Sequence, residues 1–188
     1  DKRIGSRFLR AGPAYGGSCF PKDTKAIAVT ANLFKTNLSI IKSVINSNRN
    51  RRMLLIKRIG NILSNKFKNK KITILGVTFK PNTDDMREST SLLMIPFLNK
   101  KGAKITYYDP SGEKDEFTKL KNVLFINDIS EACRNADLII IHTEWDEFKT
   151  IDFKKMKKNK KLKIYDMRNL YSTERMKKLG LSYYSIGR

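Results

Sequence analysis

The chain has 188 residues, of which 40% are hydrophobic and 30% charged, and its formal net charge is +21. This length and composition predict a soluble globular protein with a buried core and exclude a disordered chain. No apolar run approaches the roughly 20 residues needed to cross a bilayer, so we expect no membrane partner. Two cysteines are too few for a disulfide framework and indicate a reducing, cytoplasmic compartment. One histidine and no cysteine-rich spacing predict that no zinc or iron is bound.

The first residues, Asp1-Lys2-Arg3, contain neither a Met nor the apolar segment of a signal peptide. We therefore expect a part of a longer protein. Lysines are spread along the whole length, with one dense run at residues 154–163. Because few aromatic residues interrupt that run, a solvated helix face is favoured over a nucleic-acid patch, and we expect no nucleic-acid partner.

Near the start of the chain, residues 12–19 form a glycine-rich loop. A helical run over 24–34 follows, with Pro21 suited to its first turn. Residues 37–65 are predicted to form one long amphipathic helix, because apolar side chains recur every three or four positions. Asn48 and Arg52 interrupt the apolar stripe of that helix. The helix is therefore either a core helix of its own domain or a subunit interface in which polar residues set the register.

After a polar linker at 66–71, the pattern changes to alternating strands and helices. The expected strands are 71–77, 104–108, 123–126, 137–142, 162–165 and 182–186, and the expected helices are 89–101, 129–135, 151–156 and 172–179. Strands separated by helices are typical of a doubly wound parallel sheet. We therefore expect an α/β protein with a helical domain at 1–66 and a Rossmann-like domain at 67–188.

Ligands of such a sheet bind at the carboxyl ends of its strands, where the loops contain Lys80, Arg87 and Arg168. These cations predict an anionic ligand. The first loop, residues 76–82, does not fit the G-x-G-x-x-G pattern, so we expect a nucleotide held by Lys and Arg side chains instead of a dinucleotide in the usual position. His142 could be a general base, but its position at a strand end favours a structural, hydrogen-bonded role.

The glycine-rich loop places the thiol of Cys19 at the entrance of a helix. The helix N-terminus favours negative charge, and Lys22 lies within one turn, so both features favour the reactive thiolate. Gly16 and Gly17 permit a tight backbone and the close approach of a ligand. From these residues alone, Cys19 is either a reactive thiol or a small buried residue, whereas Cys133 is expected to be buried filler.

Four segments resemble motifs of the UDP-glucose/GDP-mannose dehydrogenase family, and within it the UDP-glucose 6-dehydrogenases. These segments are residues 12–24, 75–89, 143–145 and 166–169, in the order in which the family has them. The resemblance implies a two-step, NAD-dependent oxidation of UDP-glucose to UDP-glucuronate, in which Cys19 forms first a thiohemiacetal and then a thioester. Ala14 departs from the family, which usually has glycine there. The alternatives are a GDP-mannose or UDP-N-acetylmannosamine dehydrogenase, or a non-catalytic nucleotide-sugar-binding or dimerisation module.

The resemblance also implies roles for single residues. Cys19 is the nucleophile, Asp23 assists the reaction of water with the thioester, and Lys22 and Arg87 lie near the cofactor. The implied substrate-binding residues are Arg3, Phe8, Leu9, Arg10, Ala11, Gly12, Tyr15, Gly16, Lys80 and Arg168. Arg3 matches an arginine that the family donates to a neighbouring subunit, which implies a homodimer through the 37–65 helix. The family's NAD-binding domain lies upstream of these motifs, so we expect NAD to be held mainly there and this chain alone to be inactive.

Overall fold

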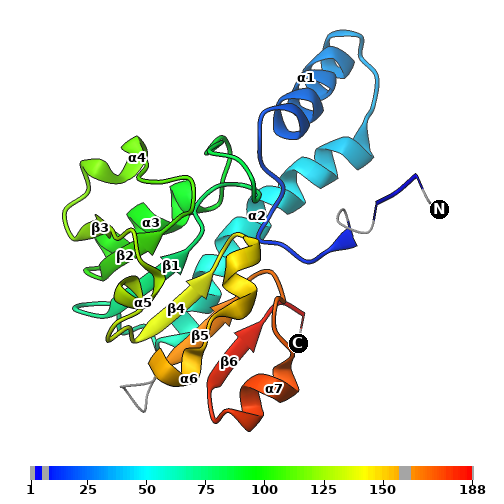
Figure 1. Ribbon diagram of the computed structural model, residues 1–188. Helices are drawn as coiled ribbons and strands as arrows, with labels where there is room; N and C mark the ends of the chain where they lie inside the picture. The colour runs from blue at the N-terminus through cyan, green and yellow to red at the C-terminus, as the bar shows by residue number, and fades with distance from the viewer. Residues whose placement is uncertain (1–2, 6–8, 157–161, 188) are drawn as a thin grey trace.

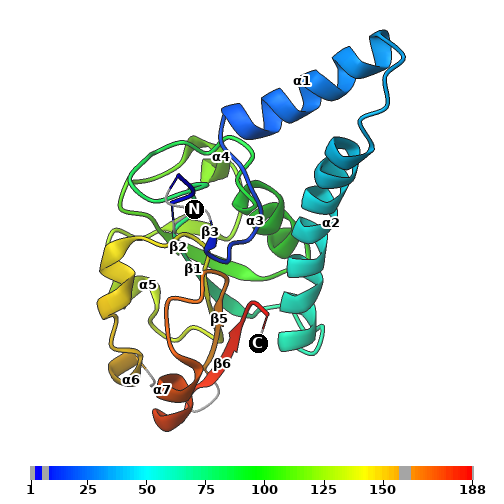
Figure 2. The same ribbon diagram turned by 90° about the vertical axis from the view of Figure 1, so that its right-hand side faces the viewer.

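The computed structural model describes residues 3–5, 9–156 and 162–187. These residues form a six-stranded sheet with helices on both faces, from which a hairpin of two helices projects (Figure 1). Turned by 90°, the molecule shows the hairpin rising beyond the edge of the sheet, so that its first helix lies clear of the sheet (Figure 2).

The two hairpin helices are α1, Cys19–Leu33, and α2, Ser39–Ile62. The long helix predicted over 37–65 is confirmed. The first helix begins five residues earlier than predicted, because the backbone is already helical at Ser18. The first turn accommodates Pro21, since a backbone N–H in the first turn of a helix has no hydrogen-bond partner within the helix.

The remaining elements alternate along the chain as the sequence predicts. The strands are β1, Lys71–Leu75; β2, Lys104–Tyr108; β3, Val123–Phe125; β4, Leu138–Ile141; β5, Lys163–Asp166; and β6, Ser182–Ser185. The helices are α3, Ser91–Lys100; α4, Asp115–Thr118; α5, Ile129–Ala132; the 3-10 helix η2, Asp146–Thr150; α6, Phe153–Met156; and α7, Thr173–Lys178. Sequence patterns did not indicate α4 and η2, because helices of one turn are too short to show a period.

All strand pairs are parallel, and their order is β3-β2-β1-β4-β5-β6. This order is that of a Rossmann-like, doubly wound sheet, and it confirms the predicted fold class. The strand order reverses between β1 and β4, so a crevice for ligands is expected at the carboxyl ends of these two strands.

Each face of the sheet is covered by its own helices. One hydrophobic cluster joins Ile74 and Ile140 to residues of α2 and α3, and the other joins Leu75 and Ile141 to residues of α5, η2, α6 and α7. The carboxyl half of α2 thus belongs to the core of the sheet: Ile59 is fully buried, whereas Ile40 at the other end is 77% exposed. The predicted division into domains at residue 66 stays a prediction.

Candidate functional site

A cavity of about 830 Å³ joins the start of α1 to the carboxyl edge of the sheet. Cys19 lines it from the glycine-rich loop, Lys80 from the loop after β1, and Arg168 from the loop after β5. Of the predicted substrate-binding residues, seven line this cavity: Arg10, Ala11, Gly12, Tyr15, Gly16, Lys80 and Arg168. The fold therefore brings the thiol and these two cations to one space, although they are separated by up to 149 positions in the chain.

A second cavity, of about 690 Å³, lies beside the first. It contains the two residues predicted near the cofactor, Lys22 and Arg87. Gly17 and Ser18 line both cavities, so the glycine-rich loop is a wall that the two spaces share. Cys19 is the next residue after Ser18.

Three other predicted site residues, Leu9, Arg3 and Asp23, line neither cavity. Leu9 is 78% exposed, and Arg3 is also exposed. Asp23 lies one turn after Cys19 on the same face of α1, and its carboxylate is 3.5 Å from the Lys22 ammonium in an exposed ion pair. Phe8 lies outside the described residues.

The two thiols differ as predicted in their surroundings. Cys19 is exposed, and its Sγ lies 3.5 Å from Ser18 Oγ. The pKa of the Arg87 guanidinium is raised, chiefly by its hydrogen bond to Asp85 and by the charge of that carboxylate. Cys133 is buried, and burial raises the pKa of its thiol to about 12. The prediction that Cys133 is a buried residue is thus confirmed.

The glycines of the loop are required by contact with the protein itself. A Cβ on Gly16 would lie 2.7 Å from the carbonyl oxygen of Glu88, and one on Gly17 would lie 2.7 Å from the ring of Phe79. Gly17 has φ +82 and donates its N–H to Arg87 O at 2.8 Å. The sequence predicted close approach of a ligand at these glycines. In the structure both glycines have the loop after β1 as a close neighbour and also line the cavity, so the approach of a ligand stays a prediction.

Replacing Gly17 with alanine is expected to lower the free energy of unfolding by more than the roughly 1 kcal/mol that a left-handed backbone costs a residue with a Cβ. The additional cost comes from the contact with Phe79. Gly112 is the matched control, since it has φ +86 and a Cβ there would have nothing within 4 Å. Urea unfolding of Gly17→Ala and Gly112→Ala measures the difference, and equal losses would contradict a steric role for Phe79.

Three polar side chains of α2 hold the backbone of the glycine-rich loop. Asn48 accepts from Tyr15 N at 3.0 Å and donates to Tyr15 O at 3.1 Å, while Arg51 donates twice to Gly12 O. Arg52 Nη2 also donates to Tyr15 O, at 3.1 Å. The polar interruptions of the apolar stripe thus bind a loop of the same chain. Sequence reasoning assigned them no role in the site, although their four-residue spacing places them on one helix face.

The side chain of Arg168 is bonded to three other residues. Its guanidinium donates to His142 O at 2.9 Å and to Phe79 O at 3.0 Å, and it pairs with Glu144 at 2.8 Å. Burial lowers the pKa of Arg168, and the carboxylate of Glu144 acts against that shift. Gly12 passes so close that a Cβ there would lie 2.8 Å from Nη1. Arg168 therefore joins the loops after β1, β4 and β5 behind the cavity.

The surroundings of His142 fit the predicted structural role. The ring is fully buried, and its Nδ1 lies 3.0 Å from Thr143 Oγ1. Burial, together with the nearby charge of Arg168, lowers the pKa of His142 to about 3. The imidazole is therefore neutral at physiological pH and has no contact with solvent, which argues against a general base.

The backbone amide groups of the turn after β1 are bonded to another part of the same chain. Val77 N and Thr78 N donate to one carboxylate oxygen of Asp109, at 2.7 and 3.3 Å. Asp109 is fully buried at the end of β2. In a dinucleotide-binding turn such amides face a pyrophosphate. Here a carboxylate of the protein already satisfies them, which supports the inference that a nucleotide is held by side chains at this edge.

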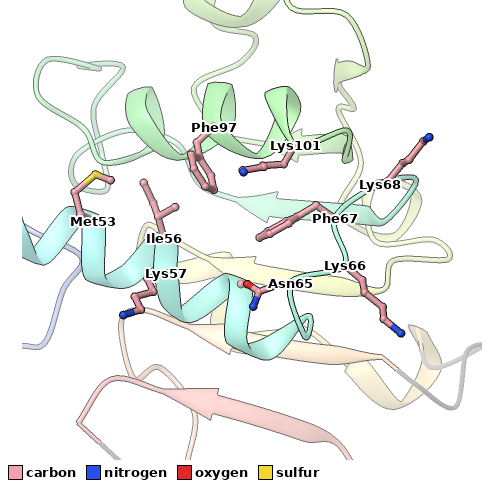
Figure 3. Close-up of a pocket in the computed structure, with 10 residues that line it drawn as sticks. Met53, Ile56, Lys57, Asn65, Lys66, Phe67, Lys68, Phe97 and Lys101 are labelled. Atoms are coloured by element: carbon pink, nitrogen blue, oxygen red, sulfur yellow. The ribbon is translucent and has the colours of Figure 1, made fainter.

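A third cavity, of about 640 Å³, lies between α2 and α3 (Figure 3), and Cys19 does not line it. Phe67 and Phe97 meet edge to face in it, with lysines around the rim, but none of the predicted site residues lines it.

Among the described residues, no group of three or more His, Cys, Asp or Glu side chains is placed to hold a metal ion. Within the same ranges, no helix combines the length and the apolar character that a membrane crossing requires.

Known proteins resemble this chain over its whole length. It is 40% identical over 189 residues to a UDP-glucose 6-dehydrogenase of Rhizobium meliloti and 40% identical over 190 residues to one of Rickettsia prowazekii. All of this chain matches, but it spans only 43% and 44% of those two proteins. Among solved structures, a UDP-glucose dehydrogenase of Pyrobaculum islandicum superposes with a TM-score of 0.80 at 26% identity, over 100% of this chain and 40% of its own.

Two family models match different parts of the sequence. The central domain of the UDP-glucose/GDP-mannose dehydrogenase family matches residues 1–50, which contain Cys19. The UDP binding domain of the same family matches residues 73–173, which contain Lys80, Arg87 and Arg168. With the second match covering more than half of its length, the chain belongs to the UDP-glucose/GDP-mannose dehydrogenase family.

Proposed function

We propose that this chain supplies the nucleophile and the sugar-nucleotide site of a UDP-glucose 6-dehydrogenase, which oxidises UDP-glucose to UDP-glucuronate with NAD. The observation that carries the proposal is one cavity, which is lined by the exposed thiol of Cys19 and by the cations Lys80 and Arg168. A thiol suits the chemistry of an aldehyde, and cations suit a diphosphate, so one elongated substrate can engage both.

In the proposed reaction, the C6 alcohol of the sugar loses a hydride and a proton and becomes an aldehyde. Cys19 Sγ then adds to the aldehyde carbon, which gives a thiohemiacetal. Loss of a second hydride from the carbon and of the hydroxyl proton gives a thioester. Water then adds to the thioester carbon, and the C–S bond breaks to release the carboxylate and the free thiol. Asp23, one turn along α1 from Cys19, is proposed to accept a proton from that water. The covalent bond keeps the aldehyde from escaping between the two oxidations.

NAD would accept one hydride in each oxidation, so the two steps would use two NAD molecules in turn. The cavity that contains Lys22 and Arg87 fits one edge of such a cofactor, because both side chains are cations and the cavity adjoins the wall beside Cys19. The turn after β1 does not fit it, since Asp109 occupies its amides. We therefore propose that this chain contributes Lys22 and Arg87 at the edge of the cofactor site, and that most of that site belongs to a domain outside this chain.

We also propose a homodimer through the helical hairpin. Apolar side chains are exposed along α1 and the first half of α2: Phe20, Ile27, Val29, Leu33, Phe34, Ile40 and Val44. A surface of this kind is typical of a contact with another chain or domain. Arg3 is proposed to reach the active site of the partner subunit. We also propose a cytoplasmic location, because the mechanism needs a reduced thiol.

Titration of the chain with UDP, UDP-glucose and GDP tests the proposed substrate. We expect UDP and UDP-glucose to bind more tightly than GDP, and Lys80→Ala to weaken UDP binding by about 10-fold, as loss of a charge-assisted hydrogen bond does. The exposed Lys177 of α7, replaced by alanine, is the control and should leave UDP binding unchanged. Tighter binding of GDP would favour a GDP-mannose dehydrogenase, and salt-sensitive binding of random DNA would favour a nucleic-acid partner.

A further inference from the structure

We infer that Arg52 is a positioning residue, which fixes the Cys19 loop against the loop after β1 so that the thiol faces the sugar end of a bound nucleotide sugar. This inference rests on the proposed function and adds to it a residue outside the family-matched central and UDP-binding segments. Its basis is a set of hydrogen bonds that join three separate parts of the chain.

Arg52 bonds to two loops with one guanidinium. Its Nη2 donates to Tyr15 O at 3.1 Å and to Glu88 O at 2.8 Å, and its Nη1 pairs with Glu88 Oε2 at 2.9 Å. Tyr15 lies in the glycine-rich loop, and Glu88 ends the loop after β1. One rigid, planar group therefore sets the distance between the two loops.

The Glu88 side of this arrangement is also fixed. Glu88 has a left-handed backbone, with φ 55, and its carboxylate takes a second ion pair at 2.7 Å from Lys25 of α1. The hydrogen bonds from Lys25 and Arg52 hold the pKa of Glu88 below its usual value. Gly16 of the glycine-rich loop packs on the main-chain carbonyl of Glu88, while the Glu88 carboxylate bonds to Arg52 and Lys25.

Arg52 is placed to hold this geometry rigidly. Only 11% of its side chain is exposed, whereas Glu88 and Lys25 are more accessible. Asn48, one turn earlier on α2, accepts from the backbone N–H of Tyr15 and donates to its carbonyl oxygen. Cys19 lies four residues beyond Tyr15. The orientation of the Tyr15 backbone therefore determines where the thiol lies relative to Lys80 across the cavity. Arg52 lines the cavity that contains Lys22 and Arg87 and not the one that contains Cys19 and Lys80, so it need not touch the nucleotide sugar for this role.

The experiment uses alkylation of Cys19 by iodoacetamide, followed by mass spectrometry, with and without saturating UDP-glucose. In the unchanged chain, we expect bound UDP-glucose to slow alkylation of Cys19 by about 10-fold or more, because the sugar covers a correctly placed thiol. In Arg52→Met, this protection should fall to about 2-fold or less, while the dissociation constant of UDP changes by less than about 3-fold. Arg52→Lys, which keeps the charge but not the planar fork, should restore part of the protection.

Arg49→Met is the matched control, because Arg49 lies on the exposed side of α2 and should leave protection unchanged. If Arg52→Met does not fold, Asn48→Ala gives the same test, since it removes the two bonds to the Tyr15 peptide. Equal protection in the unchanged chain and in the Arg52 and Asn48 variants would overturn the inference alone. A lack of protection in the unchanged chain would overturn the proposed function and the inference with it.

Discussion

Replacing Cys19 with alanine is expected to lower the rate of UDP-glucuronate formation by on the order of 10³-fold or more, the scale on which loss of a catalytic nucleophile acts. The reason is chemical: without the thiol no thiohemiacetal forms, and the aldehyde has no covalent route to the second oxidation. The assay combines this chain with the family's NAD-binding domain and follows NADH and UDP-glucuronate from UDP-glucose. An aldehyde-trapping reagent should collect the intermediate in Cys19→Ala.

The control for this prediction is the second thiol of the chain. Cys133 is buried on the face of the sheet covered by α5 to α7 and lines neither cavity of the site. Cys133→Ala should therefore keep the rate close to that of the unchanged protein. A Cys19→Ala variant that still forms UDP-glucuronate at a comparable rate would rule out covalent catalysis by this residue, although it would not by itself exclude nucleotide binding.

Replacing Arg168 with methionine is expected to lower the free energy of unfolding by about 3–5 kcal/mol, as removal of one partner from a buried ion pair does. The side chains of Arg168 and Glu144 are only 10% and 19% exposed, so solvent screens the remaining carboxylate poorly. The carbonyl oxygens of Phe79 and His142 also lose their donor. Urea unfolding, followed by circular dichroism, measures the loss.

Two further variants separate the causes of that loss. The double variant Arg168→Met with Glu144→Gln removes the uncompensated charge and should recover part of the stability. Arg175→Ala on the exposed side of α7 is the control and should change the free energy of unfolding by no more than about 0.5 kcal/mol. If Arg168→Met unfolds at the same urea concentration as the unchanged chain, the ion pair with Glu144 has no net structural role, and Arg168 acts only on the ligand.

Local patterns in the sequence were sufficient for most of the fold. The apolar periodicity over 37–65 predicted α2, and runs such as Leu138–Ile141 predicted strands, because burial on both faces of a parallel sheet demands continuous apolar residues. The segments that escaped prediction, α4 and η2, are single turns whose residues carry no periodicity. The starting point of α1 was also missed, because the helix begins within the loop at Cys19.

The sequence by itself determined the chemical groups of this protein: a thiol at a helix entrance, cations at the carboxyl edge of a parallel sheet, and two glycines beside the thiol. Only the tertiary structure decided their partners. Gly16 and Gly17 face Glu88 and Phe79, and Arg52 joins two loops that its sequence position does not connect. The physical reason is that periodicity reports which side of an element is buried, whereas the contacts of a polar side chain depend on loops that return to it from distant parts of the chain.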